Sequence, residues 1–224
     1  MGYSASQAKA FIEHIAPIIC AEADKRGYAI RSTVIAQAII EGAAGTSGLA
    51  KNYHNHFGMK CGSSWKGWAV NMKTKEEYTP GTLTTIKDNF RAYDSDADGV
   101  AGYYDFINTK RYANLKNAVN YRQYAEYLKS DGWATSSSYV NTLVSTVKKY
   151  GLWVYDKDAR REYYPKYSGD SDSIIDALDS LSIDSSRENR KHIYVANFAD
   201  DYKFTAKQNM ALLILLKDGK LAKP

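Results

Sequence analysis

The chain has 224 residues, of which 44% are hydrophobic and 25% are charged, a balance typical of a globular protein. It contains no run of about 18 apolar residues, so we expect no membrane span. Two cysteines, Cys20 and Cys61, are too few for a disulfide framework; we expect two reduced thiols, with one disulfide between them as the alternative. The net charge of +5 comes entirely from residues 1–170, which contain 22 Lys or Arg and 17 Asp or Glu. This favours a polyanionic partner, but no dense basic run supports nucleic acid binding.

Helical periodicity dominates the start of the chain. Ser4 and Gln7 fit a capping box, and Gly27 is placed to end the helix that they begin. Pro17 lies inside the apolar stripe and should kink or divide this helix. The stripe consists of Phe11, Ile12, Ile15, Ile18 and Ile19.

A second helix is expected from Ser32 to Glu41, where the glycines at 42, 45 and 48 stop it. Glu41 shares one helical face with Val34 and Ala38, and that face is otherwise directed at the core. Desolvation there would raise the pKa of the carboxyl, and an acid that is protonated near neutral pH can act as a general acid. The alternative is that Glu41 simply caps the helix end or forms an ion pair there.

Residues 68–93 change to the alternation typical of strands. Val70, Met72 and Thr74 alternate with polar residues, and residues 79–81, Thr-Pro-Gly, predict a turn, so we expect a β-hairpin. Helical patterns return at residues 98–107, 112–129 and 138–149. The main part of the chain is therefore expected to be helical with one small β excursion, an α+β arrangement.

A polar segment, residues 156–172, is predicted to be a linker because it contains Pro165 and Gly169. It separates an expected domain of residues 1–155 from a small helical module of residues 173–224. Three short helices are expected in the module: Ser173–Leu181, Ser186–Ala196 and Thr205–Lys217.

Several ordered motifs resemble those of one known family. They are Ala36-Gln37-Ala38-Ile39-Ile40-Glu41, Gly45-x-Ser47, Asn55-His56-Phe57-Gly58-Met59-Lys60, Thr74-Lys75-Glu76-Glu77-Tyr78, Phe90-Arg91-Ala92-Tyr93, Arg111-Tyr112, Ala134-Thr135 and Tyr139. Over residues 5–152 they resemble glycoside hydrolase family 73. The resemblance implies a lysozyme-like fold and a bacterial or phage N-acetylglucosaminidase, which cuts the β-1,4 bond after N-acetylglucosamine in peptidoglycan.

The resemblance also implies particular site residues. Glu41 would be the general acid, and Glu77, or else Glu76, would hold a water as base or stabilise the developing oxocarbenium charge. Strand alternation sends the two hairpin side chains to opposite faces, so only one can face the cleft. The substrate's own acetamide is an alternative to a second carboxylate. Expected substrate contacts are Gln37, Asn55, Phe57, Tyr93, Tyr112, Trp133 and Tyr139, with Tyr53, Trp65 and Trp68 as further aromatic candidates.

Two positions depart from the family pattern on the expected substrate side. Ala44 stands where the family often has an aromatic residue, and Trp133 stands where tyrosine is common. These departures prompt one alternative of a different class, a non-catalytic wall-binding or phage structural protein. A muramidase or lytic transglycosylase on the same fold, which would also use Glu41, is the other alternative.

Two patterns imitate metal sites. Asp94-x-Asp96-x-Asp98-Gly99, with Asp105 in the twelfth place, imitates an EF-hand loop, but the same acidic residues suit a helix start. His54-x-His56 lacks a third ligand at a spacing typical of zinc. We therefore expect neither a metal nor another cofactor.

The last 50 or so residues resemble a short repeat found at the ends of peptidoglycan hydrolases. The resemblance rests on Leu181-Ser182-Ile183-Asp184-Ser185-Ser186, Arg190-Lys191, Thr205-Ala206-Lys207-Gln208-Asn209 and Leu216-Lys217-Asp218-Gly219. It implies attachment to the bacterial wall. We also expect the protein to be a monomer and to act outside the cell. The first residues show no basic patch followed by an apolar core, so we expect release by a phage holin, unless the chain was trimmed for expression.

Overall fold

The computed structural model describes residues 2–63, 65–79, 82–157, 162–198 and 201–223, with the side chains of residues 74–79 and 82–86 left out. Its elements in chain order are α1 (Ala5–Arg26), α2 (Ser32–Glu41), α3 (Gly48–Tyr53), β1 (Ala69–Thr79), β2 (Thr82–Arg91), α4 (Asp96–Ile107), the 3₁₀ helix η1 (Lys110–Asn117), α5 (Tyr121–Ser130), α6 (Tyr139–Tyr150), the 3₁₀ helix η2 (Leu152–Tyr155), α7 (Ile174–Ser180), α8 (Arg187–Phe198) and α9 (Ala206–Lys217). This mainly helical architecture with one antiparallel hairpin confirms the predicted α+β class. None of the described helices is long and apolar enough to cross a membrane.

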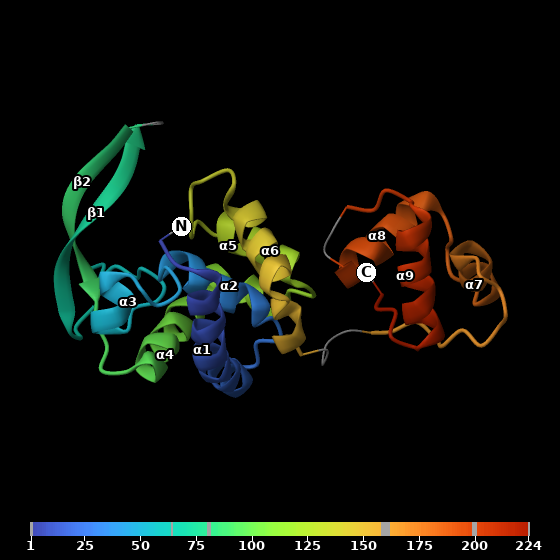
Figure 1. The fold of residues 1–224 in the computed structure, drawn as a ribbon, viewed down its shortest axis with the longest axis horizontal. Helices are drawn as coiled ribbons and strands as arrows, with labels where there is room; N and C mark the ends of the chain where they lie inside the picture. Colours follow the sequence, from blue (N-terminus) through green and yellow to red (C-terminus); the bar gives the residue numbers. More distant parts are fainter. Residues whose placement is uncertain (1, 64, 80–81, 158–161, 199–200, 224) are drawn as a thin grey trace.

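Helix α2 forms the centre of the first hydrophobic core. Every residue from Ser32 to Ile39 is buried, because apolar or small side chains occupy all faces of the helix. It packs against α1, α5, α6 and η2, which surround it in Figure 1. The residue at its C-terminal end, Glu41, is therefore held by the most enclosed element of the fold.

Helix α1 begins at the predicted capping box, since Ser4 Oγ accepts from Gln7 N–H and the Gln7 side chain accepts from Ser4 N–H. Pro17, expected to kink or divide this helix, does not divide it, because α1 continues through Pro17. Pro17 and Glu13, whose carbonyl the proline leaves unpaired, are both exposed. Water can satisfy that carbonyl, so the helix tolerates the proline.

The N-terminus of α2 is capped from a distant part of the sequence. Asp156 Oδ1 accepts from the backbone N–H groups of Arg31 and Ser32 at 2.7 and 2.8 Å, and its Oδ2 accepts from the Ser32 hydroxyl at 2.7 Å. Lys157 N–H also donates to Ala29 O at 2.9 Å. Residues 156–157, at the start of the expected linker, thus complete the helix that carries Glu41.

The β-hairpin leaves the helical core at one end of the molecule (Figure 1). Its register runs from Ala69 opposite Arg91 to Thr79 opposite Thr82, with an irregularity between Glu77 and Thr79. A bridge between Lys60 and Phe90 ties its base to the preceding loop. The predicted hairpin is confirmed, while residues 80–81 of its predicted turn lie outside the described residues.

Two local differences from the sequence prediction, and one agreement with it, follow from short-range capping. The helix expected at 112–129 is two elements, η1 and α5, because the Asn120 side chain accepts from Gln123 N–H and starts α5 afresh. Ser47 caps α3 in the same way, a helix that the glycine-rich pattern did not predict. Asp96 to Asp105 lie in α4, with Ser95 as its N-cap, so the acidic pattern is a helix start and not an EF-hand loop.

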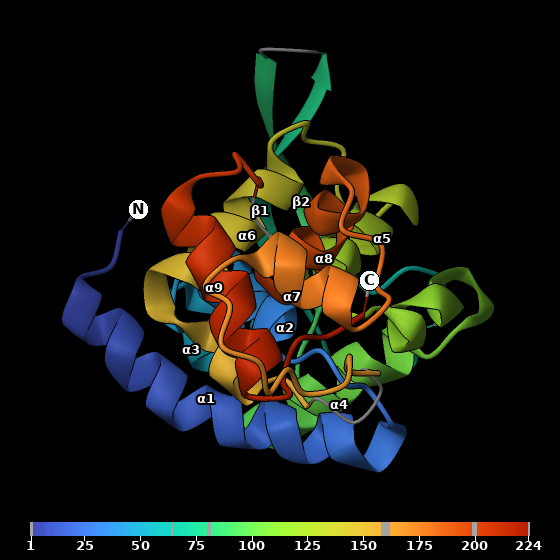
Figure 2. The same cartoon turned by 90° about the vertical axis from the view of Figure 1, so that its right-hand side faces the viewer.

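Helices α7 to α9 enclose a second hydrophobic core, to which the chain before α7 also contributes (Figure 2). Tyr163 pairs with Ala222, Tyr164 N–H donates to Leu221 O, and buried Tyr167 packs into this core. The second half of the expected linker is therefore part of the module. Between the two cores the Tyr121 hydroxyl donates to Phe198 O at 2.7 Å.

Cys20 and Cys61 are free thiols, as expected. Burial raises the pKa of both, which disfavours the reactive thiolate.

Candidate active site

Glu41 ends α2, and its side chain is exposed, whereas Val34 and Ala38 on the same helical face are fully buried. Only glycine fits directly after Glu41, because a Cβ at Gly42 would lie 2.7 Å from Ala38 O and 3.0 Å from His56 O. The carboxyl is thus accessible to a large ligand, although it sits on the most buried helix.

Protein atoms surround the Glu41 carboxyl closely enough for desolvation to raise its pKa above the usual value. Hydrogen bonds from Tyr139 and Trp133 favour the charged form and offset this only in part. No described residue forms an ion pair with Glu41, so an ion pair does not explain its position. The raised pKa is the shift that a general acid requires.

A line of buried hydrogen bonds supports the carboxyl. The Tyr103 hydroxyl donates to Gln37 Oε1 at 2.5 Å, Gln37 Nε2 donates to the Tyr139 hydroxyl at 3.0 Å, and that hydroxyl donates to Glu41 Oε1 at 3.4 Å. Burial first, and the Glu41 charge second, raise the pKa of Tyr139, so it stays a proton donor. Each hydrogen bond fixes the next side chain in the series, and the last one orients the Glu41 carboxyl.

Trp133 joins the acid to a cluster of aromatic rings. Its indole is half-buried and hydrogen-bonds Glu41. Its ring centroid lies 5.4 Å from Tyr103, 5.7 Å from Phe106 and 6.3 Å from Tyr112. The tryptophan that departs from the family pattern thus contacts the candidate acid directly.

Three of the expected substrate contacts are fully enclosed. Gln37 is 0% exposed and serves the line of hydrogen bonds described above. Asn55 is 1% exposed: its Nδ2 donates to Met59 O and Arg91 O, and its Oδ1 accepts from Met59 N–H. Phe57 stacks on Tyr103 with centroids 4.1 Å apart. These side chains hold the loop and the hairpin base against α4, and they offer no surface to a ligand.

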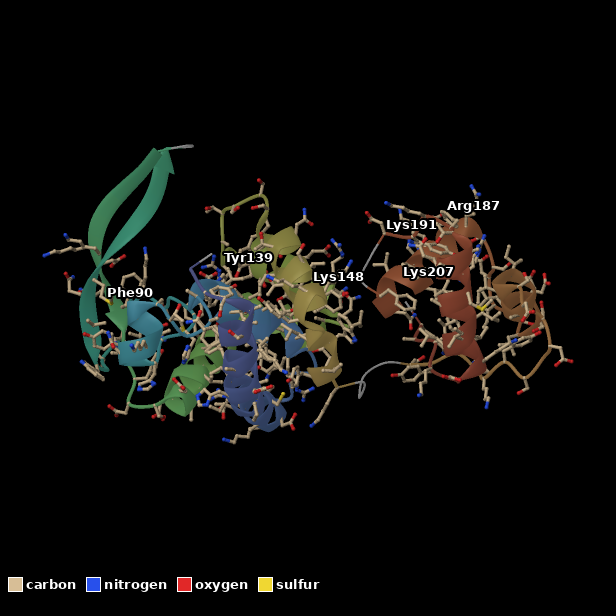
Figure 3. The ribbon with its side chains drawn as sticks, in the orientation of Figure 1. Phe90, Tyr139, Lys148, Arg187, Lys191 and Lys207 are labelled. Atoms are coloured by element: carbon tan, nitrogen blue, oxygen red, sulfur yellow. The ribbon has the colours of Figure 1, made fainter. Side chains whose placement is uncertain are left out.

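The other expected contacts differ in accessibility. Tyr93, Tyr112 and Tyr139 are buried, and Tyr139, the first residue of α6, is labelled in Figure 3. Trp68, 52% exposed, meets Tyr53 edge-on at the hairpin base. Ala44 is buried in a turn and has a positive φ of 51°. The residue type at this position is therefore constrained by the backbone geometry and not by contact with a ligand.

Both candidates for a second carboxylate lie on β1. Glu76 pairs with Thr84 and Glu77 with Leu83, on the strand segment whose side chains lie outside the described residues. Which of the two faces Glu41 therefore remains an expectation from the sequence.

Three of the four histidines converge on one carboxylate beside the site. Asp96 Oδ1 hydrogen-bonds His54 Nδ1 and His56 Nε2, both at 2.7 Å, and its Oδ2 hydrogen-bonds His14 Nε2 at 2.6 Å. His56 first, then His14 and His54, hold the pKa of Asp96 well below its usual range. The cluster ties the loop after α3 to α1 and α4, a role that the spacing of His54 and His56 gave no sign of.

Tyr103 is another supporting residue that sequence reasoning missed. Its position in α4 matches an ordinary core tyrosine, and only the fold brings it to Gln37. No signal in the sequence separates it from its neighbour Tyr104.

An accessible carboxyl with a raised pKa at the end of a buried helix is what acid-assisted cleavage of a glycosidic bond requires, and the fold is that of the lysozyme-like glycoside hydrolases. A family model of glucosaminidases, described as mannosyl-glycoprotein endo-beta-N-acetylglucosaminidase, matches residues 16–152. The chain belongs to this glucosaminidase family, which confirms the resemblance seen in its motifs.

Two curated relatives have names of the same kind. Exo-glucosaminidase LytG of Bacillus subtilis is 33% identical over 136 residues, which cover 58% of this chain and 47% of that protein. Peptidoglycan hydrolase FlgJ of Salmonella typhimurium is 31% identical over 121 residues, 52% of this chain and 38% of that protein. The chain thus spans about half or less of the length of these relatives.

Solved structures agree on the fold. The catalytic domain of the autolysin Auto from Listeria monocytogenes superposes with a TM-score of 0.58 and 25% identity, over 70% of this chain and 91% of that one. An N-acetylmuramoyl-L-alanine amidase from Staphylococcus aureus gives a TM-score of 0.60 and 29% identity, over 69% of this chain and 44% of that one.

Proposed function

We propose that the chain hydrolyses the β-1,4 bond between N-acetylglucosamine and N-acetylmuramic acid in peptidoglycan, with Glu41 as general acid. The observation that carries this proposal is the raised pKa of an accessible carboxyl on a buried helix. The names of the relatives LytG and FlgJ support the choice of sugar and polymer.

In this mechanism the protonated Glu41 gives its proton to the glycosidic oxygen as the bond to the anomeric carbon breaks. Tyr139 and Trp133 then stabilise the carboxylate that forms, because both donate hydrogen bonds to it. The oxocarbenium-like sugar is stabilised by Glu77, or else Glu76, or by its own acetamide. A water adds to the anomeric carbon, and its proton returns to a carboxylate.

The test is mass spectrometry of digested peptidoglycan. Our proposal predicts fragments with N-acetylglucosamine at the reducing end. Reducing N-acetylmuramic acid would instead identify a muramidase, and an anhydro end would identify a lytic transglycosylase. If intact walls are bound but never cut, the non-catalytic alternative holds.

We infer further that residues 173–224 attach the enzyme to the wall, at the cell exterior and as a monomer. Arg187 and Lys191 stand one turn apart on α8 and are exposed, and the Arg187 guanidinium lies 4.9 Å from the centroid of Phe204 (Figure 3). Exposed Lys203 and Lys207 flank Phe204 in the sequence. Cations around an aromatic ring suit an anionic polymer.

The attachment is tested by pull-down on purified walls. Replacing Arg187 and Lys191 by glutamate should weaken wall binding severalfold and leave turnover of small glycan fragments unchanged. The matched control is Lys217 and Lys223 to glutamate, two cations on the same module that form ion pairs with Asp172 and Glu162. Equal binding by all three proteins would contradict the attachment surface.

A further inference from the structure

A concave site lies against the rings of Phe106 and Tyr112, which both pack on Trp133. It is a pocket of about 430 Å³ between the hairpin base and η1. Its walls include the rings of Trp65, Phe106 and Tyr112 and the side chains of Arg91 and Arg111. Two guanidiniums and three aromatic rings therefore meet in one pocket, which no step proposed above uses.

The two guanidiniums are held in place but not neutralised. Arg91 lies over the Trp65 ring at 4.6 Å from the centroid, and its Nε donates to Lys60 O at 3.1 Å. Arg111 Nε donates to Asp131 O, and its guanidinium lies 5.5 Å from the centroid of Tyr112. In both side chains the backbone contact uses Nε, which leaves terminal N–H groups to bind a ligand.

No described carboxylate forms an ion pair with either arginine. The acid in the pocket wall, Asp105, is engaged elsewhere, because its Oδ1 lies 2.6 Å from Arg26. Two fixed positive charges that pair with no described carboxylate make the pocket attractive to a carboxylate of a ligand, which an arginine fork can bind with two parallel hydrogen bonds.

The pocket is coupled to Glu41 through a single side chain. Trp133 hydrogen-bonds Glu41, and its ring packs against Phe106 and Tyr112, which are both walls of the pocket. A sugar chain lying across Trp133 would therefore reach the acid and the arginine pair together.

We propose that this pocket binds a carboxylate carried by the substrate's muramic acid branch, next to the bond at Glu41. The inference rests on the proposed function. N-acetylglucosamine carries no carboxylate, whereas N-acetylmuramic acid carries a lactyl group, free or extended by an acidic peptide. The arginine pair would thus distinguish the two alternating sugars and set the register of the chain in the cleft, while the rings support the apolar faces of the sugar.

The experiment compares three glycans: chains with peptides, chains stripped of peptides so that the lactyl carboxylate is free, and N-acetylglucosamine oligomers. Arg111→Gln should raise KM for at least one carboxylate-bearing glycan about tenfold with little change in kcat, the loss expected for one charge-assisted bond. KM for the oligomers should not change. The glycan most affected identifies the lactyl or the peptide carboxylate as the ligand.

Arg111→Lys, which keeps the charge but not the fork, should lie between wild type and Arg111→Gln. Lys110→Gln is the matched control, since it removes a neighbouring exposed cation that does not line the pocket. Melting temperatures show whether each variant is folded. Should the Arg111 variants unfold, the wild type still decides: salt must raise KM for the carboxylate-bearing glycans and not for the oligomers.

Two results would overturn the inference: an unchanged KM for both carboxylate-bearing glycans in Arg111→Gln, or an equal rise for the oligomers. Failure of the proposed function is distinct, since wild type would then release reducing N-acetylmuramic acid, an anhydro end or no end at all. Titration of the Glu41→Gln protein with the three glycans measures Kd without turnover, so binding in the pocket can be judged in either case.

Discussion

At the scale of single residues, the site depends on how Tyr139 shares its hydroxyl between Gln37 and Glu41. The hydroxyl accepts from Gln37 and donates to Glu41, and this bond lowers the pKa of a carboxyl that desolvation raises. The group that orients the acid therefore also limits how far its pKa rises.

Tyr139→Phe removes that donor. Because the bond favours the charged carboxylate, we predict that the pKa of Glu41 rises further, and that the alkaline limb of the pH–rate profile moves to higher pH. The Gln37 amide loses a partner in a buried site, which should cost about 1–3 kcal/mol of stability. A pH profile of kcat together with thermal melts checks both effects, and an alkaline limb that stays in place would count against Glu41 as the titrating acid.

The hydrogen bonds of Asp96 lead to a second prediction, which concerns the free energy of unfolding. Its folded pKa is depressed, so it stabilises the fold at pH above its unfolded pKa of about 3.9, and that contribution is lost as pH falls through the folded value. Asp96→Asn should lower the free energy of unfolding at pH 7 by about 1–3 kcal/mol. It should also flatten the acid side of the curve of stability against pH.

Asp98→Asn provides the control, since Asp98 is exposed on the same first turn and bonds only Ser95 in the described structure. Chemical denaturation between pH 3 and 7 measures all three proteins. If the Asp96 and Asp98 variants lose stability equally, the histidine cluster contributes nothing specific.

Sequence reasoning found the candidate acid but not the residues that support it. Glu41 stands out because a carboxylate at that spacing is rare on a core-directed face, and the ordered motifs single it out independently. Gln37, Asn55 and Phe57 share those motifs, yet they are buried and support the site from behind. A motif records that a position is constrained, and it does not say whether a ligand or the core constrains it.

At the scale of elements, α2 depends on a cap that its own sequence does not contain. Arg31, at the N-cap position, provides no side-chain cap bond, and Asp156 accepts from both terminal N–H groups instead. The N-terminus of α2, the helix that carries Glu41, is therefore hydrogen-bonded to Asp156, which follows the last helix of the first core.

Asp156→Ala should lower stability by about 1–2 kcal/mol, the usual cost of losing a helix cap. For a chain of this size that corresponds to a fall in Tm of roughly 2–8 °C. Asp170→Ala, at an exposed position of the same polar segment, should leave Tm unchanged. Equal melting temperatures for the two variants would show that Asp156 is dispensable.

Element boundaries could be predicted wherever a periodic pattern met a local cap. Ser4 for α1 and Thr205 for α9 both agree with the structure. The predictions failed where the decisive partner is distant in sequence. Asp156 reaches back to residue 31, and Tyr163 pairs with Ala222, so a polar stretch that resembles a linker belongs to two folded cores.

At the scale of the whole molecule, the two hydrophobic cores set where the chain can be divided. We predict that residues 1–157 fold and cleave small glycan fragments, but bind intact walls less well, because a second tethered site raises the effective concentration at the polymer. A chain that ends at 155 lacks the Asp156 cap and should melt lower than residues 1–157. Turnover on fragments, wall pull-down and thermal melts compare both with the full chain.

Loss of turnover in residues 1–157 would show that the module completes the catalytic fold. Wall binding equal to that of the full chain would refute the attachment role of residues 173–224.

The central claim is that Glu41 donates the proton, and the rate of reducing-end release by Glu41→Gln tests it most directly. Glutamine keeps the shape of the side chain but cannot give up a proton in the same way, so we predict a loss of roughly 10²–10⁴ in rate. Since the folded pKa of Glu41 is raised, its ionised form costs stability at pH above the unfolded value, and Tm should be unchanged or higher. A Glu41→Gln protein that is folded and cuts peptidoglycan at the wild-type rate would contradict the account.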